Sequence, residues 1–192
     1  MLSLTANVAG IVIGGSAGAL EALDTLLPAL PPRFPAAVFI VLHLPRDRPS
    51  MLASIFAAKC LLPVEEAEDK APARPGTIYF APPDYHLLIE EGPCLALSVD
   101  DPVNLSRPSI DVLFESAADV YRQSLMGIIL SGASADGAEG LAAVHSAGGI
   151  TVVQEPQSAA VPLMSTSALQ RCAADWVLPL AEIAALLRRI HR

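Results

Sequence analysis

The chain has 192 residues, 53% of them hydrophobic, and a formal net charge of −8; this length suits one well-buried core, so we expect a single domain over residues 1–192. The apolar residues lie in short runs, the most continuous at 36–42, and with no cationic secretory start they predict a cytoplasmic protein without membrane insertion. The negative charge argues against nucleic acid as a partner, because phosphate binding needs clustered Lys and Arg.

Short β-branched runs alternate with longer helical patterns along the chain. Runs that predict strands buried on both faces cover 8–13, 37–42, 127–130 and 150–153. Apolar residues at three- and four-residue intervals predict helices over 19–30, 50–59, 110–121, 138–147 and 181–190. This alternation predicts the α/β class, with a doubly wound, mostly parallel sheet and helices on both of its faces.

The middle of the chain departs from that alternation. Three short apolar runs, at 77–81, 86–90 and 94–99, are separated by turns that contain Pro82, Pro83 and Pro93. Because closely spaced short strands are typical of hairpins, we expect a short antiparallel excursion around residues 77–99.

The first predicted strand runs into the sequence Gly14-Gly15-Ser16-Ala17-Gly18 and then directly into a helical pattern. A strand, a glycine turn and a helix hold a serine hydroxyl at the carboxyl edge of a sheet and direct helix N-terminal amides at the same space. Ser16 is therefore a candidate nucleophile. Alternatively, Ser16 merely caps the helix. A dinucleotide-binding fingerprint is disfavoured, because Ser16 and Ala19 stand where its glycines belong.

His43 follows the second predicted strand, in the sequence Val-Leu-His-Leu-Pro at 41–45. Sequential strands are usually neighbours in such sheets, so His43 should lie beside the end of the first strand. A neutral imidazole there could take the serine proton and return it to a leaving alcohol. His86, His145 and His191 lie in a strand, in a helix and at the C-terminus, and they are weaker candidates.

Asp136 is a carboxylate placed after the buried run at 127–130 and just before a predicted helix. It could accept the other ring N–H of His43 and so fix the tautomer of the imidazole. The alternative is that Asp136 caps the helix that follows it. Glu155, after the strand at 150–153, is the reserve candidate.

Five segments in this order resemble the CheB family of protein-glutamate methylesterases. They are IGGSAGA at 13–19, VLHLP at 41–45, YFAPPDYHL at 79–87, RPSIDVLF at 107–114, and LSG through DG at 130–137. The order and the spacing agree from about Val8 to the C-terminus, which makes the resemblance much more specific than the serine motif alone.

The resemblance implies a catalytic triad of Ser16, His43 and Asp136, with no metal and no organic cofactor. It implies hydrolysis of methyl esters on glutamates of chemoreceptor cytoplasmic helices, sometimes with glutamine deamidation. We expect the backbone N–H groups near Ala17 and Ala133 to form the oxyanion hole. Full-length CheB proteins carry an N-terminal receiver domain, whereas this chain starts at the catalytic strand, so a separate receiver protein is an expected regulatory partner.

The chain departs from the family pattern at several positions. Ala17 and Ala19 stand where the family has Thr and Gly, Ala133-Ser134 replaces Met-Gly, and Ser165 replaces Pro. The triad residue types survive, so these changes bear on rate and substrate preference. Two alternatives stay open: a catalytically weak interaction module, against which a reactive Ser16 would argue, and a hydrolase of another ester or amide, which a screen of small esters would reveal.

Overall fold

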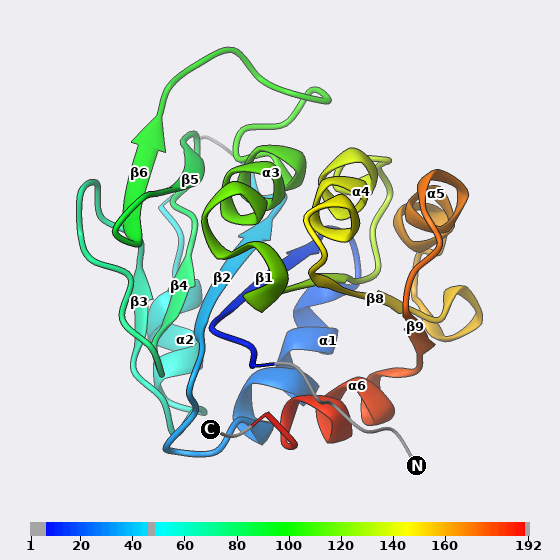
Figure 1. Ribbon diagram of the computed structural model, residues 1–192, viewed down its shortest axis with the longest axis horizontal. Coiled ribbons are helices and arrows are strands. Elements are labelled where there is room, and N and C mark those ends of the chain that lie inside the picture. The colour runs from blue at the N-terminus through cyan, green and yellow to red at the C-terminus, as the bar shows by residue number, and fades with distance from the viewer. Residues whose placement is uncertain (1–6, 46–48, 191–192) are drawn as a thin grey trace.

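The computed structural model describes residues 7–45 and 49–190, which form a central sheet covered by helices (Figure 1). The sheet has seven strands, all paired in parallel, in the order β3-β4-β2-β1-β7-β8-β9. Its strands are β1 (Gly10–Gly15), β2 (Ala37–Leu42), β3 (Val64–Glu66), β4 (Ile78–Phe80), β7 (Leu125–Ile129), β8 (Ile150–Gln154) and β9 (Trp176–Leu178). A separate antiparallel pair joins β5 (His86–Glu90) to β6 (Cys94–Ser98).

Helices cover both faces of the sheet (Figure 1). One face carries α1 (Ala19–Leu26), α2 (Leu52–Ala57) and α6 (Leu180–Leu187), and the other carries α3 (Ile110–Tyr121), α4 (Ala138–Ser146) and α5 (Leu163–Arg171). Short 3₁₀ helices lie at Leu27–Ala29, Arg122–Ser124 and Pro156–Ser158. None of the helices in the described ranges has the length and apolar character needed to cross a membrane.

Two hydrophobic cores follow from the alternation of side chains along each strand. In β1, Ile11 and Ile13 point to the core beneath α1, whereas Val12 points to the core beneath α3. Every residue of β1 and β2 is buried. These strands therefore read as continuous apolar runs, which is why the sequence alone predicts them as strands covered on both faces.

The predicted fold class is confirmed, but the antiparallel excursion is smaller than expected. The run at 77–81 contains β4, which pairs in parallel with both β2 and β3 in the main sheet. Its three residues Ile78, Tyr79 and Phe80 are all buried, as a central strand requires. The turn at Pro82 and Pro83 leads out of the sheet rather than back along β4, and only 86–98 forms the antiparallel pair.

The order of the strands creates a topological switch point between β1 and β7. From β1 the chain passes through α1 to β2 on one side, and from β7 it passes through α4 to β8 on the other side. In doubly wound sheets, ligands bind in the crevice outside the carboxyl ends of the strands at such a point. Ser16 follows β1 and Asp136 follows the end of β7, so both lie where this crevice is expected.

Candidate active site

Ser16 lies in a tight connection between β1 and α1. Its backbone N–H donates to the carbonyl of Ser131, at 2.9 Å, which ties the connection to the loop after β7. Gly18 has a φ of 79° and forms the N-cap of α1, a left-handed conformation that glycine adopts without steric cost. The strand and the helix approach each other closely here, because a Cβ placed on Gly15 would lie 2.4 Å from the Cβ of Ala19.

Replacing Gly15 with alanine should therefore strain this junction. The obstructing atom belongs to the short side chain of Ala19, so relief requires α1 to move relative to β1. We expect Gly15→Ala to lower the free energy of unfolding by about 1–3 kcal/mol, as overpacked cores do, measured by urea denaturation. Ala17→Ser, on an exposed neighbour, is the control and should change it by less than about 0.5 kcal/mol. Equal stability of both variants would contradict this account.

His43 follows β2 and lies beside the serine connection. The strand register pairs Gly15 with Leu42, and the backbone N–H of His43 donates to the carbonyl of Gly15, at 3.2 Å. Gly15 and Leu42 face each other on adjacent strands, and Ser16 and His43 are the residues that directly follow them. The described residues include no hydrogen bond between the Ser16 hydroxyl and the imidazole. Such contacts in unliganded sites often tighten only when substrate binds.

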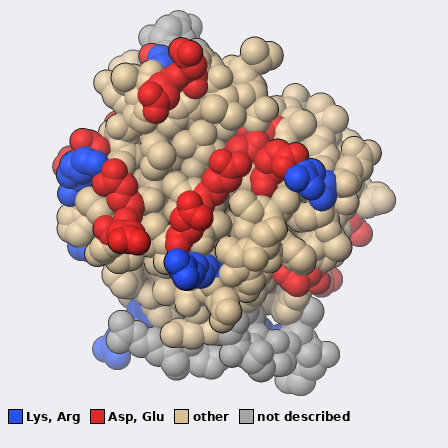
Figure 2. Space-filling model, turned by 45° about the horizontal axis from the view of Figure 1, so that its top comes forward, with Lys and Arg blue, Asp and Glu red and all other residues tan. Residues whose placement is uncertain are grey.

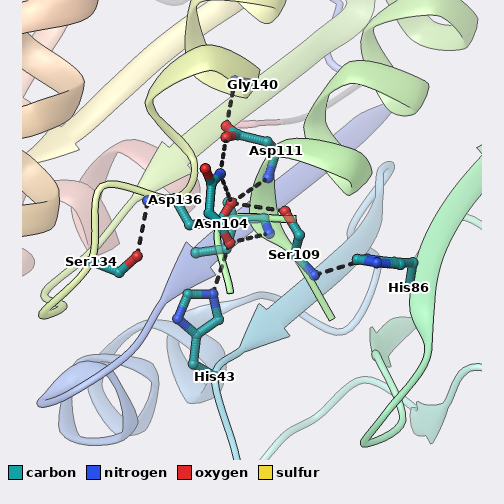
Figure 3. Close-up of polar contacts among 9 residues, drawn as sticks. His43, His86, Asn104, Ser109, Asp111, Ser134, Asp136 and Gly140 are labelled. Atoms are coloured by element: carbon teal, nitrogen blue, oxygen red, sulfur yellow. Dashed lines mark hydrogen bonds and ion pairs between the residues drawn. The ribbon is translucent and has the colours of Figure 1, made fainter. Parts of the chain in front are cut away.

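The Asp136 carboxylate is completely buried and accepts hydrogen bonds from five groups, most of them drawn in Figure 3. His43 Nε2 lies 2.8 Å from Oδ2, which also accepts from the N–H of Ile110 at 2.7 Å. Oδ1 accepts from the amide of Asn104 and the hydroxyl of Ser109, each at 2.8 Å, and from the N–H of Asp111 at 3.3 Å. The site therefore brings His43 and Asp136 into direct contact.

The alternative that Asp136 caps its own helix is wrong. The N-cap of α4 is Gly137, with a φ of 97°, and Asp136 makes no side-chain hydrogen bond to the first turn of α4. The Asp136 side chain instead points to the N-terminus of α3, where it accepts from two backbone N–H groups. Asp111 of α3 does the reverse, accepting from the N–H of Gly140 in α4 at 2.6 Å. A carboxylate that precedes α4 thus accepts from the first N–H groups of α3, and a carboxylate of α3 accepts from an N–H group in the first turn of α4.

These hydrogen bonds keep Asp136 ionised in spite of its burial. Burial by itself would raise the pKa of Asp136, but the hydrogen bonds from His43, Asn104, Ile110 and Ser109 outweigh it and hold this pKa below its ordinary value. Asp111 has fewer donors, and burial raises its pKa to about 6, with the nearby charge of Asp136 acting in the same direction. Of the two neighbouring carboxylates, Asp136 is therefore the permanent anion.

Acidic side chains also gather on the outer face formed by α3 and α4 (Figure 2). Partial burial, followed by the charges of Glu139 and Asp119, raises the pKa of Glu115 in this group. The charge of Asp136 acts on the pKa of Glu115 in the same direction, so these carboxylates repel one another.

The contact with Asp136 defines the tautomer of His43. An ionised carboxylate has no proton to donate, so the imidazole must carry its hydrogen on Nε2 when it bonds to Asp136. Nδ1 of the neutral ring then holds a lone pair. A ring held in this way has one nitrogen committed to the carboxylate and the other available to accept a proton.

The two residues predicted at the oxyanion hole, Ala17 and Ala133, are both exposed at the sheet edge. Within residues 7–45 and 49–190 their backbone N–H groups donate no hydrogen bond. The two loops are joined, because the Ser131 hydroxyl donates to the carbonyl of Ala17 at 2.7 Å. Gly132, which follows Ser131, lies close to the nucleophile, since a Cβ placed on Gly132 would lie 3.0 Å from the Cβ of Ser16.

Sequence reasoning missed the residues that surround Asp136. Asn104 comes from a loop without any periodic pattern, so no sequence signal marks it. Ser109 and Asp111 lie in the family-like segment at 107–114, which could have indicated them. The reserve candidate Glu155 is not a partner of His43 among the described residues.

Of the other histidines, the two in the described ranges, His86 and His145, make no hydrogen bond to His43 or Asp136. His86 is buried and structural, since its Nδ1 accepts from the N–H of Ser109 at 3.2 Å. His145 is exposed on α4, and His191 lies outside the described residues. Of the departures from the family pattern, Ser134 accepts from the N–H of Asp136 at 3.1 Å. Ser165 is buried, and its hydroxyl has no partner in the part of the chain that the structure describes.

These features define the class of protein. A doubly wound parallel sheet carries a glycine-flanked serine, a histidine and a buried carboxylate at the ends of β1, β2 and β7, beside the topological switch point. This arrangement is typical of α/β enzymes that hydrolyse esters or amides through a serine.

Comparison with known proteins gives the family. The model of the CheB methylesterase family matches residues 11–187. The chain therefore belongs to the CheB methylesterase family. The crystal structure of the CheB methylesterase catalytic domain from Thermotoga maritima is similar, with a TM-score of 0.91 and 33% identity, over 96% of this chain and 99% of that one.

Two relatives show how the chain compares in length. A protein from Leptospira interrogans, provisionally named protein-glutamate methylesterase/protein-glutamine glutaminase, is 44% identical over 97% of this chain and 96% of its own length. The protein-glutamate methylesterase/protein-glutamine glutaminase 2 of Anaeromyxobacter dehalogenans is 40% identical over 97% of this chain and 54% of its own length. The chain thus spans nearly all of one relative and about half of the other.

Proposed function

We propose that this protein is a protein-glutamate methylesterase of chemosensory adaptation, with Ser16 as nucleophile, His43 as base and Asp136 as the group that orients the base. The contact between His43 Nε2 and the buried Asp136 carboxylate, at 2.8 Å beside the connection that holds Ser16, carries the proposal. Membership of the CheB methylesterase family supports the same chemistry.

In the first step, the Ser16 oxygen attacks the carbonyl carbon of a glutamate methyl ester, and its proton passes to Nδ1 of His43. The resulting imidazolium is stabilised by Asp136, which stays ionised because its donors outweigh its burial. Collapse of the tetrahedral intermediate breaks the bond to the methoxy oxygen. His43 gives this oxygen the proton, so that methanol leaves and an acyl-serine remains.

In the second step, water replaces methanol. His43 takes a proton from the water as it attacks the acyl-serine, and returns that proton to the Ser16 oxygen as the ester bond breaks. The products are the free enzyme and a glutamate side chain. The same route would convert glutamine, with ammonia as the leaving group in place of methanol, as the names of the relatives indicate for those proteins.

The negative oxygen of both intermediates needs preorganised donors. We assign this role to the backbone N–H groups of Ala17 and Ala133. Both residues are exposed, and neither N–H group donates a hydrogen bond within the described ranges. Loss of one such donor in a serine hydrolase typically costs about a hundredfold to a thousandfold in turnover.

The substrate of this reaction is a methylated glutamate on a cytoplasmic helix of a chemoreceptor, which would place the enzyme in the cytoplasm. We also predict that a separate receiver protein regulates the enzyme. It would be tested by adding a phosphorylated receiver protein to the methanol assay and looking for a change in rate.

The function itself is tested by methanol release. We expect the wild-type protein to release methanol from a methylated chemoreceptor cytoplasmic fragment, at a rate proportional to enzyme concentration, and to release ammonia from the corresponding glutamine form. The unmethylated glutamate form of the fragment is the control and should give neither product. Hydrolysis of small esters without any release from the fragment would instead point to another ester as substrate.

A further inference from the structure

The loop between β6 and α3 contains a tight turn at Val103–Ser106. Val103 and Ser106 exchange backbone hydrogen bonds of 3.1 and 2.9 Å. The two residues between them both have positive φ angles, 50° at Asn104 and 62° at Leu105. Two consecutive left-handed residues are the mark of a type I′ turn, in which asparagine suits the first position and glycine the second. Leu105 is therefore an unfavourable residue for its backbone conformation.

Asn104 points inward from this turn to the buried carboxylates (Figure 3). Its side-chain amide donates to Oδ1 of Asp136 at 2.8 Å and to Oδ2 of Asp111 at 2.7 Å. One NH₂ group thus bridges two carboxylates that repel each other. The Asp136 oxygen that it contacts is not the one bonded to His43, so Asn104 fixes the carboxylate from the side opposite the imidazole.

The surrounding loop holds the turn in place. Arg107 donates to the carboxylate of Asp84, at 2.8 Å from Nη2, and to the carbonyls of Val99 and Asp100. His86 contacts the carbonyl of Asp101 at 3.2 Å on one side and the N–H of Ser109 on the other. The backbone around Asn104 is therefore held by contacts other than the bond of its own side chain to Asp136.

Leu105, the second residue of the turn, is 94% exposed. Together with His43, Leu44 and Pro108 it lines a small hollow of about 90 Å³. A glycine would fit this backbone conformation better than a leucine does. Unfavourable conformations that persist beside a reactive group are a reason to look for a functional role.

We propose that the two residues of this turn serve the reaction in different ways. Asn104 is a positioning residue that holds the Asp136 carboxylate in register with His43. Leu105 contacts the protein substrate, packing against the apolar side of the receptor helix that carries the methyl ester. The second assignment rests on the proposed function, because it takes the methylated receptor helix as substrate.

The chemistry of the substrate fits an apolar contact. A methyl ester is neutral and less polar than the carboxylate it becomes, and the protein is acidic overall, with a net charge of −8. The hollow beside His43 has room for the end of one side chain, so we expect a helix that delivers its ester there to contact the exposed residue Leu105 in its lining. Leu105 should thus contribute to the binding of a protein substrate.

Two adjacent glycine substitutions separate these roles, because glycine keeps the left-handed backbone at both positions. Asn104→Gly should lower kcat by roughly tenfold to a hundredfold on both methylated receptor fragment and p-nitrophenyl acetate, with KM nearly unchanged, as misplacement of a catalytic group does. Leu105→Gly should raise KM for the fragment by roughly tenfold, as loss of an apolar contact does, with kcat on the fragment nearly unchanged. Identical kinetic effects of the two variants would overturn the division of roles.

A third variant tests whether Asn104 merely shapes the turn. Aspartate tolerates the left-handed conformation and has the shape of asparagine, so a purely structural role predicts that Asn104→Asp is at least as active as Asn104→Gly. A positioning role predicts the opposite, because a third carboxylate would face Asp136 and Asp111 without a donor. Lys70→Gly, at an exposed left-handed residue with a φ of 61°, is the matched control and should behave as wild type.

The same assays separate this inference from the proposed function. If the wild-type protein hydrolyses p-nitrophenyl acetate but releases no methanol from the fragment, the proposed substrate fails, and the role of Leu105 fails with it. The role of Asn104 is then still decided by the small ester. If the wild-type protein releases methanol and Leu105→Gly keeps the wild-type KM, only the Leu105 contact is overturned.

Discussion

Ser16→Ala should lower the rate of methanol release from a methylated receptor fragment by roughly four to six powers of ten. The substitution removes the oxygen that forms the acyl-enzyme, whereas the junction around it keeps the packing of Gly15 against Ala19. His43→Ala should cause a loss of the same size, because without the imidazole the serine proton has no acceptor. The double variant should be hardly slower than either single variant, since each removes the same pathway.

Matched controls are available on α4, where His145 and Ser146 are both exposed. His145→Ala and Ser146→Ala should keep wild-type rates. Circular dichroism and the thermal midpoint of each variant would show that the fold is intact. Losses that multiply in the double variant would mean that Ser16 and His43 act independently, and the triad would then be wrong as a unit.

The fold could be predicted where a single physical pattern dominates. β2 and α3 have the predicted boundaries, because β2 is a wholly buried apolar run and α3 an amphipathic helix with sustained periodicity. The parallel strand β4 was predicted as part of a hairpin, since its three residues give a signal too short to tell the two apart. Helix α5 was missed, because the Ser-Thr-Ser run at its centre has low helix propensity.

The candidate site also has a part that the sequence predicts and a part that it does not. Ser16, His43 and Asp136 all follow strands of one parallel sheet, and the carboxyl ends of such strands meet at one edge, so their proximity follows from the strand assignment. The capping hypothesis for Asp136 failed because it considered only the helix next in sequence. The carboxylate instead binds α3, which is brought to it by tertiary packing of the two helices.

Asn104 shows what a single sequence cannot supply. It reaches the site from a loop that leaves β6, is tied down through Arg107 and His86, and returns to α3. The contacts of His86 and Asp136 join residues 23 and 32 apart in sequence, whereas the contact of Arg107 with Val99 joins residues 8 apart, and none of the three follows a periodic pattern. The loop's conformation is a property of the packed protein.

Asp136→Asn should lower methanol release by about four powers of ten while the protein remains folded. The substitution replaces one carboxylate oxygen with an NH₂ group. If that group faces His43 and the N–H of Ile110, two donors oppose it, and the imidazole must turn its lone pair to the amide and carry its hydrogen on the nitrogen that should accept the serine proton. If it faces the other way, it opposes the donors of Asn104 and Ser109. Neither orientation reproduces the native hydrogen bonds.

Asp175 provides the matched control, since its carboxylate is also structural, accepting from the N–H and the hydroxyl of Thr151 at 2.8 Å. Asp175→Asn should reduce the thermal midpoint but leave the rate of methanol release near that of wild type. A folded Asp136→Asn protein with a wild-type rate would remove Asp136 from the triad. If Asp136→Asn unfolds while Asp175→Asn stays folded, the main role of the Asp136 carboxylate is to hold the N-terminus of α3. The orientation of His43 would then depend on that packing.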